Sequence, residues 1–230
     1  MTEAEAGGEI CRVGRSLFER GYVHATAGNI SVRLSADEGG GFLITPTDAC
    51  LGFLEPARLA RLDADGQQQS GERASKTIAL HRRIYAASEG TAAQARCVIH
   101  THSAHCVALT LGGRAIDTPH GRELLPALTP YFVMKVGHVP LIGYARPGAP
   151  EAAAEAEAAI ARYHAAGTPI RAVMLERLGP NVWHDTPAAA MATLEELEET
   201  AKLWMFTLRE TGPLTPLQLG ALREAFGARW

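Results

Sequence analysis

Three histidines lie close together in the segment CVIHTHSAHC, residues 97–106. The segment begins as an apolar run, so His100 and His102 are expected at a strand end, where side chains two positions apart share a face. Two such imidazoles are a start for a divalent metal site, with the second nitrogen of each ring bonded to another acceptor. His105 follows at a helix start, as a third ligand or such an acceptor. A bare His-x-His is also common among ordinary core or surface histidines, so both interpretations stay open.

Several Thr, Ser, Gly and Asn residues lie where predicted elements begin or end. TAGN (26–29) precedes a predicted strand, TPT (45–47) ends another, and Ser75 opens a predicted helix. Free backbone NH groups and hydroxyls at such positions suit a phosphate. The same residues are also ordinary choices for turns and caps.

Helix and strand signals alternate along the chain, which predicts one α/β domain over residues 1–230. Helices are predicted at 2–20, 75–88, 103–113, 149–167 and 186–210, with a short one in the tail. Strands are predicted at 28–34 and 41–47 as a hairpin, within 58–72, at 95–102, within 139–148, and over 170–183 with a turn at Gly179-Pro180. Ser75 is expected to cap its helix.

The composition is that of a globular protein. The 230 residues are 47% hydrophobic and 20% charged, with a net charge of -3 and no long basic block, so neither nucleic acid nor an anionic membrane is expected as a partner. No apolar run approaches the roughly 20 residues that cross a bilayer. The N-terminus is acidic, and the four cysteines are scattered without metal-binding spacing, so a reduced, cytoplasmic protein is expected.

The order of several segments resembles the class II aldolase/adducin-like superfamily, which includes fuculose-1-phosphate aldolase. These are TAGNISVR, GFLITPT, SKTIALHRRIY, VIHTHSAHCVAL and a late Gly-Pro before a long helix. TDACLGFLEPARLARLDADG, LTPYFVMKVGHVPLIGYARPG and ELEETAKL are similar to its 3-oxo-tetronate 4-phosphate decarboxylase branch. The likeness covers roughly residues 9 to 226. It implies a central, mostly antiparallel sheet flanked by helices, and a homotetramer with active sites at subunit interfaces.

The resemblance also implies a phosphate pocket. By that match, the phosphate contacts are Asn29, Thr45 and Ser75, with the backbone NH groups of Gly28 and Thr47 nearby. The substrate implied is a small phosphorylated or carboxylated molecule.

The resemblance further implies a divalent cation, usually zinc, held by three histidines, of which His100 and His102 match two. Such a cation polarises a substrate carbonyl and holds the charge of the enediolate left when a carbon–carbon bond breaks. An aldolase loses an aldehyde in that step, and a decarboxylase loses CO2.

Two positions depart from the family pattern. Thr77 stands where the family has an acid/base Glu, and a threonine hydroxyl does not titrate near neutral pH. The neighbouring Lys76 is a candidate to bind a substrate carboxylate or to donate a proton. Leu178 stands at the position of the third metal histidine. Glu176 shares a face of the predicted strand with Leu178 and is a candidate substitute ligand, although an ion pair with Arg177 would also explain it.

Other polar residues remain as further candidates. Tyr131 matches a proton-donating tyrosine of related aldolases, or it is a core residue. Lys135 and Arg146 are candidates for anion recognition or plain surface charges. The remaining candidates for the metal or the pocket are His24, His105, His138 and His184.

The sequence therefore predicts a metal-dependent lyase, a decarboxylase or an aldolase, acting on a small phosphorylated sugar or sugar acid. Zinc is the expected metal, with manganese or iron(II) as alternatives. Thr77 and Leu178 keep other functions open. These are a redirected enzyme, such as an iron(II) oxygenase or a metal-free isomerase or dehydratase, and a non-catalytic binding homologue.

Overall fold

The computed structural model describes residues 1–113, 115–207 and 212–230. The helices are α1 (Glu3–Glu19), α2 (Ile78–Ala87), α3 (Ala104–Leu111), α4 (Pro130–Lys135), α5 (Pro150–Ala165), α6 (Pro187–Phe206) and α7 (Pro216–Phe226), with short 3-10 helices η1 (Ala36–Glu38), η2 (Leu51–Phe53) and η3 (Pro56–Arg58). The strands are β1 (Asn29–Arg33), β2 (Phe42–Ile44), β3 (Ala60–Leu62), β4 (Gln68–Ser70), β5 (Cys97–His100), β6 (Ile116–Thr118), β7 (Gly121–Glu123), β8 (Leu141–Ile142), β9 (Ala172–Leu175) and β10 (Gly179–His184).

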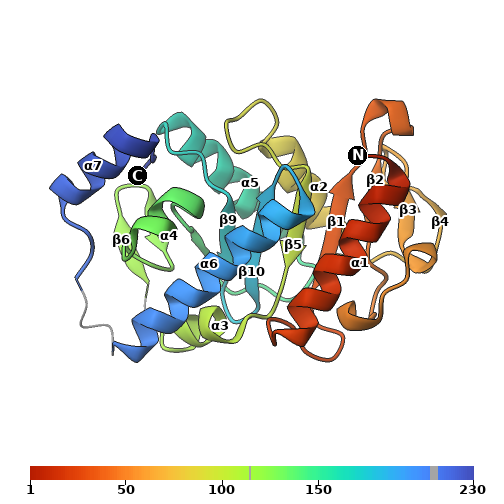
Figure 1. Cartoon of the computed structure of the whole chain (residues 1–230), viewed down its shortest axis with the longest axis horizontal. Coiled ribbons are helices and arrows are strands. Elements are labelled where there is room, and N and C mark those ends of the chain that lie inside the picture. The colour runs from red at the N-terminus through yellow and green to blue at the C-terminus, as the bar shows by residue number, and fades with distance from the viewer. Residues whose placement is uncertain (114, 208–211) are drawn as a thin grey trace.

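Eight strands form one sheet in the order β4-β3-β2-β1-β5-β10-β9-β8 (Figure 1). Its neighbouring strands pair antiparallel, except for β8 and β9, which pair parallel. The predicted hairpin of residues 28–47 is present as β1 and β2. The expected mostly antiparallel sheet is confirmed.

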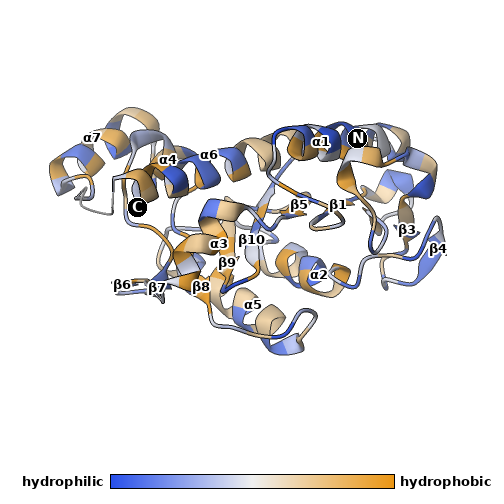
Figure 2. Cartoon of the chain, turned by 90° about the horizontal axis from the view of Figure 1, so that it is seen from below, coloured by the Kyte–Doolittle hydropathy of each residue, from blue (hydrophilic) through white to orange (hydrophobic). Residues whose placement is uncertain are grey.

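Helices cover both faces of this sheet. Figure 2 shows α1 and α6 on one side of the strands and α2 and α5 on the other. Because side chains alternate along a strand, Ile30, Ile99 and Val182 face the α1/α6 layer, where they join one buried apolar cluster. Val98 and Trp183 face the α2/α5 layer and join a second cluster. The fold is thus a three-layer α/β arrangement around two cores.

The helix ends show why most predicted helices form where they do. Thr2 makes a capping box with Glu5, and Thr186 accepts a hydrogen bond from the Ala189 amide at the start of α6. Residues 208–210 of the predicted long helix lie outside the described residues. In the part of the chain that the structure describes, none of the helices is both long and apolar enough to cross a membrane.

The start of α2 differs from the prediction. The helix begins at Ile78, its N-cap position is Thr77, and no side chain caps it. Ser75 precedes the helix in a turn, and its hydroxyl lies 3.4 Å from the Thr77 amide nitrogen. Ser75 is therefore not the helix cap that its position suggested.

The segment between β9 and β10 also differs from the prediction. Residues 176–178 form the turn, while Gly179 and Pro180 belong to β10. Arg177 takes a left-handed conformation with a φ of 63°, and Gly179 has a φ of 144°. Glu176 and Leu178 therefore do not alternate along one strand, and the expectation that they share a strand face is wrong. The pair β6/β7 and the short helix α4 were not predicted at all.

Gly179 fixes the approach of β10 to the end of β5. A Cβ at this position would lie 1.9 Å from the backbone oxygen of Thr101 and 3.2 Å from the Cα of His102. We predict that Gly179→Ala lowers the free energy of unfolding by about 2 kcal/mol or more, since it adds a backbone clash to an unfavourable φ. Urea unfolding measures this. The matched control is Gly90→Ala, since Gly90 has a φ of +73° with no atom within 4 Å of the added Cβ. An equal loss in the two variants would contradict the role of the close approach.

Candidate active site

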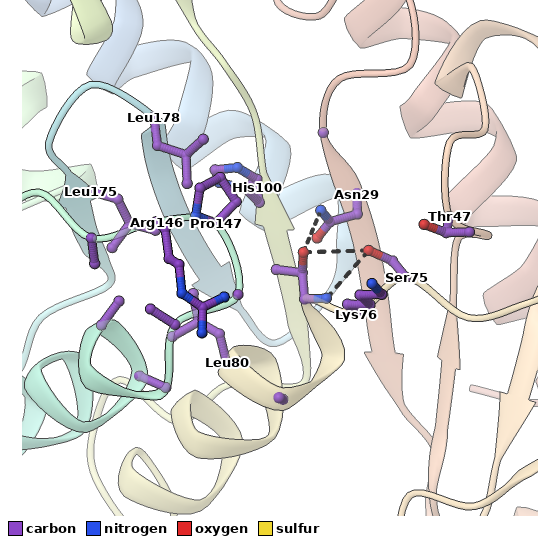
Figure 3. A pocket seen from close by; sticks show the side chains of 18 of the residues that line it. Asn29, Thr47, Ser75, Lys76, Leu80, His100, Arg146, Pro147, Leu175 and Leu178 are labelled. Atoms are coloured by element: carbon purple, nitrogen blue, oxygen red, sulfur yellow. Dashed lines mark hydrogen bonds between the residues drawn. The ribbon is translucent and has the colours of Figure 1, made fainter.

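A cavity of about 300 Å³ opens where β1 begins and β5 ends, beside the start of α2. The residues of TAGN, of 46–48 and of 75–80 line one part of it, and His100 and His102 line its base. The loop 143–150, with Leu175 and Leu178, lines the opposite part. Figure 3 shows His100 between these two walls. A volume of this size suits a small ligand.

His100 and His102 lie side by side, as the strand alternation predicted. Their ring centroids are 5.1 Å apart. His100 is buried, and its Nδ1 lies 2.9 Å from the backbone oxygen of Pro180. Since a carbonyl only accepts, Nδ1 carries the proton and Nε2 is free to accept. Burial, followed by the charge of His102, lowers the pKa of His100 to about 4, so its ring is neutral at neutral pH.

A polar row crosses the sheet at His100. Asn29 on β1 and Asn181 on β10 are both Cα partners of His100, so the three side chains lie on the same face. Asn181 is fully buried, and neither atom of its side-chain amide has a hydrogen-bond partner among the described residues. Such an amide needs a water molecule or a polar ligand nearby. Asn181 was not among the residues predicted for the site, because GPN is typical of a turn.

The wall formed by β1 and the start of α2 presents hydroxyl and amide groups. The Asn29 amide donates to the Thr77 hydroxyl at 3.2 Å, and the Ser75 hydroxyl lies 3.4 Å from the same oxygen (Figure 3). Gly28 lies against β5, because an added Cβ would be 2.8 Å from the backbone oxygen of His100. The structure thus brings Gly28, Asn29, Ser75, Lys76 and Thr77 together around one cavity.

The two threonines of TPT occupy different environments. Thr47 lines the cavity, but its backbone NH donates to the Arg73 oxygen at 2.8 Å, so only its hydroxyl faces the ligand space. Thr45 is fully buried and does not line the cavity. Its hydroxyl oxygen instead accepts from the Ile30 amide at 3.2 Å. Thr45 therefore helps to hold β1 to β2. It does not reach the cavity, which differs from the phosphate contact that was expected for it.

Cations and apolar groups face each other across the cavity. Lys76 lines the wall that carries Ser75, and Arg146 lines the loop on the other side (Figure 3). Both side chains are exposed, and in the part of the chain that the structure describes neither is paired with an acidic residue. Leu175 and Leu178 make the adjacent surface apolar. The cavity therefore offers a cation at both ends, and the carboxylate of Asp48 lines the wall that carries Lys76.

Besides Thr45, two predicted site residues lie outside the cavity of their own chain. Tyr131 is 63% exposed at the start of α4 and is not in the lining. The Glu176 carboxylate accepts from the Tyr144 amide at 3.0 Å and does not turn toward the histidines. The structure therefore does not bring Glu176 to the metal-ligating position that was considered for it.

The remaining candidates are placed as follows. His105 bonds Glu198 at 2.8 Å, and His138 bonds the buried Glu123 at 2.9 Å. His184 lies 3.7 Å from Asp185, outside the cavity lining. His24 is exposed, with its ring centroid 6.5 Å from that of His102. Lys135 lines a separate hollow with Arg171 and Arg229.

Comparison with known proteins agrees with this architecture. Residues 8–205 match the model of the class II aldolase and adducin N-terminal domain. This chain belongs to the class II aldolase and adducin family. A 3-oxo-tetronate 4-phosphate decarboxylase of Cupriavidus necator is 50% identical over 235 residues, which cover 100% of this chain and 99% of that protein. The enzyme of the same name from Escherichia coli K12 is 36% identical and covers 94% of this chain and 92% of its own length.

A solved structure shows the same fold within the family. It is YgbL from Klebsiella pneumoniae, described as a putative aldolase/epimerase/decarboxylase. It superposes with a TM-score of 0.80 and 36% identity, over 97% of this chain and 100% of that chain. The resemblance seen in the sequence is thereby confirmed at the level of family and fold.

The metal that this family generally uses, most often zinc, does not fit the donors present here. Catalytic zinc sites usually have three protein ligands. His100 and His102 supply two nitrogens, but the described residues contain no group of three His, Cys, Asp or Glu side chains placed to hold an ion. Leu178 and the Thr77 hydroxyl line the space around the pair. The side chains at this site thus do not suit the metal cofactor that is usual in the family.

A buried network supports the polar wall from behind. The Ser31 hydroxyl lies 2.7 Å from His81 Nδ1 and 2.7 Å from the Tyr85 hydroxyl, which itself donates to the Ser31 oxygen. His81 is fully buried, and burial, followed by the charge of His100, lowers the pKa of His81 to about 3. The network therefore holds a neutral imidazole beneath the site.

We predict that this imidazole makes the fold sensitive to acid. The pKa of His81 in the folded state lies below the usual value near 6.5, so the unfolded state binds more protons as pH falls below that value. Between pH 7 and pH 5, His81 should cost the fold about 2 kcal/mol of unfolding free energy. Urea unfolding of the wild type and His81→Gln at the two pH values measures this. An identical pH dependence in both proteins would contradict it.

Proposed function

We propose that this chain is a carbon–carbon lyase that decarboxylates a small 3-oxo sugar acid phosphate such as 3-oxo-tetronate 4-phosphate. The observation that carries the proposal is the cavity with cations at both ends, in a chain half identical to a decarboxylase of that name. The Asn29, Ser75 and Thr47 side chains suit the phosphate. Arg146 across the cavity suits the carboxylate, because a guanidinium binds carboxylates with two parallel hydrogen bonds.

Decarboxylation of a 3-oxo acid requires mainly that the protein orients the substrate and stabilises the negative charge that develops on it. When the bond between C1 and C2 of a 3-oxo acid breaks, its electron pair passes toward the C3 oxygen and CO2 leaves. A donor near that oxygen stabilises the developing negative charge. The neutral His100 ring and the Asn29 side chain line the cavity, where they orient the ligand, and Asn181 lies beside His100 in the same row of the sheet.

The assembly and the location belong to the same proposal. A homotetramer would place the exposed Tyr131 at the cavity of a neighbouring subunit, where its hydroxyl would donate the proton that replaces CO2. The exposed aromatic ring supports this placement, since such a ring gains by burial at an interface. We place the protein in the cytoplasm, in keeping with its four free cysteines.

The direct test is turnover of 3-oxo-tetronate 4-phosphate by the purified chain. Release of CO2 and of a three-carbon ketose phosphate above the spontaneous rate is expected, while fuculose 1-phosphate should stay uncleaved. A spontaneous rate with the first substrate, at saturating protein, would overturn the proposal.

The phosphate wall gives a specific prediction. Ser75→Ala should lower kcat/KM for the phosphorylated substrate about tenfold, because a charge-assisted hydrogen bond is lost. The rate with the unphosphorylated 3-oxo acid should not change, since that substrate has no group to bond Ser75. Steady-state kinetics with both substrates measure this difference. An equal loss of kcat/KM with both substrates would mean that the phosphate binds at a site other than Ser75.

Arg146 should bind the carboxylate at the other end of the substrate. Arg146→Gln is expected to raise KM about tenfold or more through loss of the carboxylate contact. Arg12→Gln is the control, because Arg12 is an exposed arginine on α1 that pairs with Glu9. An unchanged KM in Arg146→Gln would remove Arg146 from substrate recognition.

A further inference from the structure

The surroundings of the His100–His102 pair limit its ability to bind a metal ion. The Nδ1 proton of His100 is committed to the Pro180 oxygen at 2.9 Å, which leaves one nitrogen of that ring facing the cavity. The close contact of Gly179 with Thr101 and His102 brings the end of the turn 176–178 against the pair. The side chain that this turn contributes to the cavity is Leu178 (Figure 3).

Leu178 is held where it is by packing as well as by the backbone. It packs against the apolar cluster between the sheet and the α2/α5 layer, which includes Leu175, Leu80 and Trp183. Its amide donates to the Leu175 oxygen at 3.1 Å. A leucine side chain has no atom that ligates a cation, and its packing keeps the space beside His100 apolar.

Neither Thr77 nor Glu176 replaces a ligand, and Asp48, which lines the same cavity, forms no group of three with His100 and His102 among the described residues. The Thr77 hydroxyl accepts from the Asn29 amide at 3.2 Å, and a neutral hydroxyl is a weak ligand for zinc. The Glu176 carboxylate is engaged by the Tyr144 amide. Two neutral imidazoles without a third protein ligand bind zinc weakly, because catalytic sites usually supply three.

We propose that this chain holds no resident metal ion at the His100–His102 pair, and that the ammonium group of Lys76 polarises the 3-oxo group in its place. This inference rests on the proposed function. Lys76 is the cation on the same wall as Ser75 and Thr77, in the cavity that His100 also lines, and it has no acidic partner within the described residues. A cation in a partly enclosed cavity is a suitable group to stabilise an enolate.

The reaction balances without a metal. The C1–C2 bond breaks, its electron pair forms the C2–C3 double bond, and the C3 oxygen takes a proton from the Lys76 ammonium as CO2 leaves. The resulting enediol then takes a proton at C2 that derives from water, and the C3 hydroxyl returns its proton to the Lys76 amine. Overall, one proton from water replaces CO2. No base has to remove a proton first, so the absence of a carboxylate at Thr77 does not block this step, as it would block aldol cleavage.

The first experiment measures metal content, which does not depend on activity. The tag-free chain is dialysed against zinc, manganese or iron(II) and analysed by elemental mass spectrometry, beside the double variant Thr77→Glu/Leu178→His. Both substituted positions line the cavity with His100 and His102, so the variant supplies four candidate ligands. We expect far less than one ion per wild-type chain and close to one zinc ion per variant chain. One ion per wild-type chain that is lost in His100→Ala would overturn the proposal. The wild-type result stands even if the double variant does not fold.

The second experiment measures decarboxylation of 3-oxo-tetronate 4-phosphate. The wild-type rate should not change with a chelator, and Lys76→Met should lower kcat about 100-fold, with partial recovery in Lys76→Arg. A chelator-sensitive rate that zinc restores, or an unchanged kcat in Lys76→Met, would overturn the proposal. The two hypotheses fail separately: a metal-dependent decarboxylase keeps the proposed function and removes this inference. A metal-free chain without decarboxylation removes the proposed function and, with it, the role of Lys76.

Discussion

The pairing of β5 with two antiparallel neighbours is the constraint on which the site depends. β5 contributes His100 at its last position, and the register with β1 and β10 places Asn29 and Asn181 beside it. The same register sends Ile30, Ile99 and Val182 to the opposite face, where they anchor the strands in the α1/α6 core. A shift by one residue would exchange the two sets, so burial on the apolar face holds the polar row in place.

The two cores have different consequences for the site. The α1/α6 side is apolar at the strands that carry the site, whereas the α2/α5 side encloses the buried polar groups Ser31, His81 and Tyr85 directly beneath the cavity. Buried polar networks are costly unless their members are satisfied, and His81 Nε2 has no partner among the described residues. A scaffold that only needed stability would gain from apolar residues here. We relate their polarity to the function proposed for the cavity.

The predictions from the sequence were accurate for elements with strong local signals. They were less accurate where tertiary contacts determine the position of a turn or the neighbours of a residue. Helices α1, α5 and α6 have clear periodicity and start signals, and each was placed within a few residues of its bounds. The turn 176–178 was misplaced because Gly-Pro is a common turn signal, while here Gly179 serves a close contact with Thr101. His100, His102, Asn29 and Ser75 were expected from their types and from the family resemblance, and they line one cavity. Asn181 was not expected, since only the pairing of β10 with β5 shows that it joins them.

The packing of Leu178 shows what the fold gains from a leucine at the position where the family resemblance implies a metal histidine. An exposed imidazole at the end of this turn would contribute little to packing, whereas the leucine joins the buried cluster beside Leu175. Burying such a side chain stabilises a fold by up to roughly 1.5–3 kcal/mol, less for one that is only partly buried. The polar wall and the hydrogen bond of His100 to Pro180 do not involve Leu178, so they persist unchanged. In the proposed decarboxylation, the 3-oxo group of the substrate takes up the electron pair of the breaking bond. The scaffold can therefore accept a leucine in place of a histidine, because the cavity walls that orient the substrate and one cation are sufficient for this reaction.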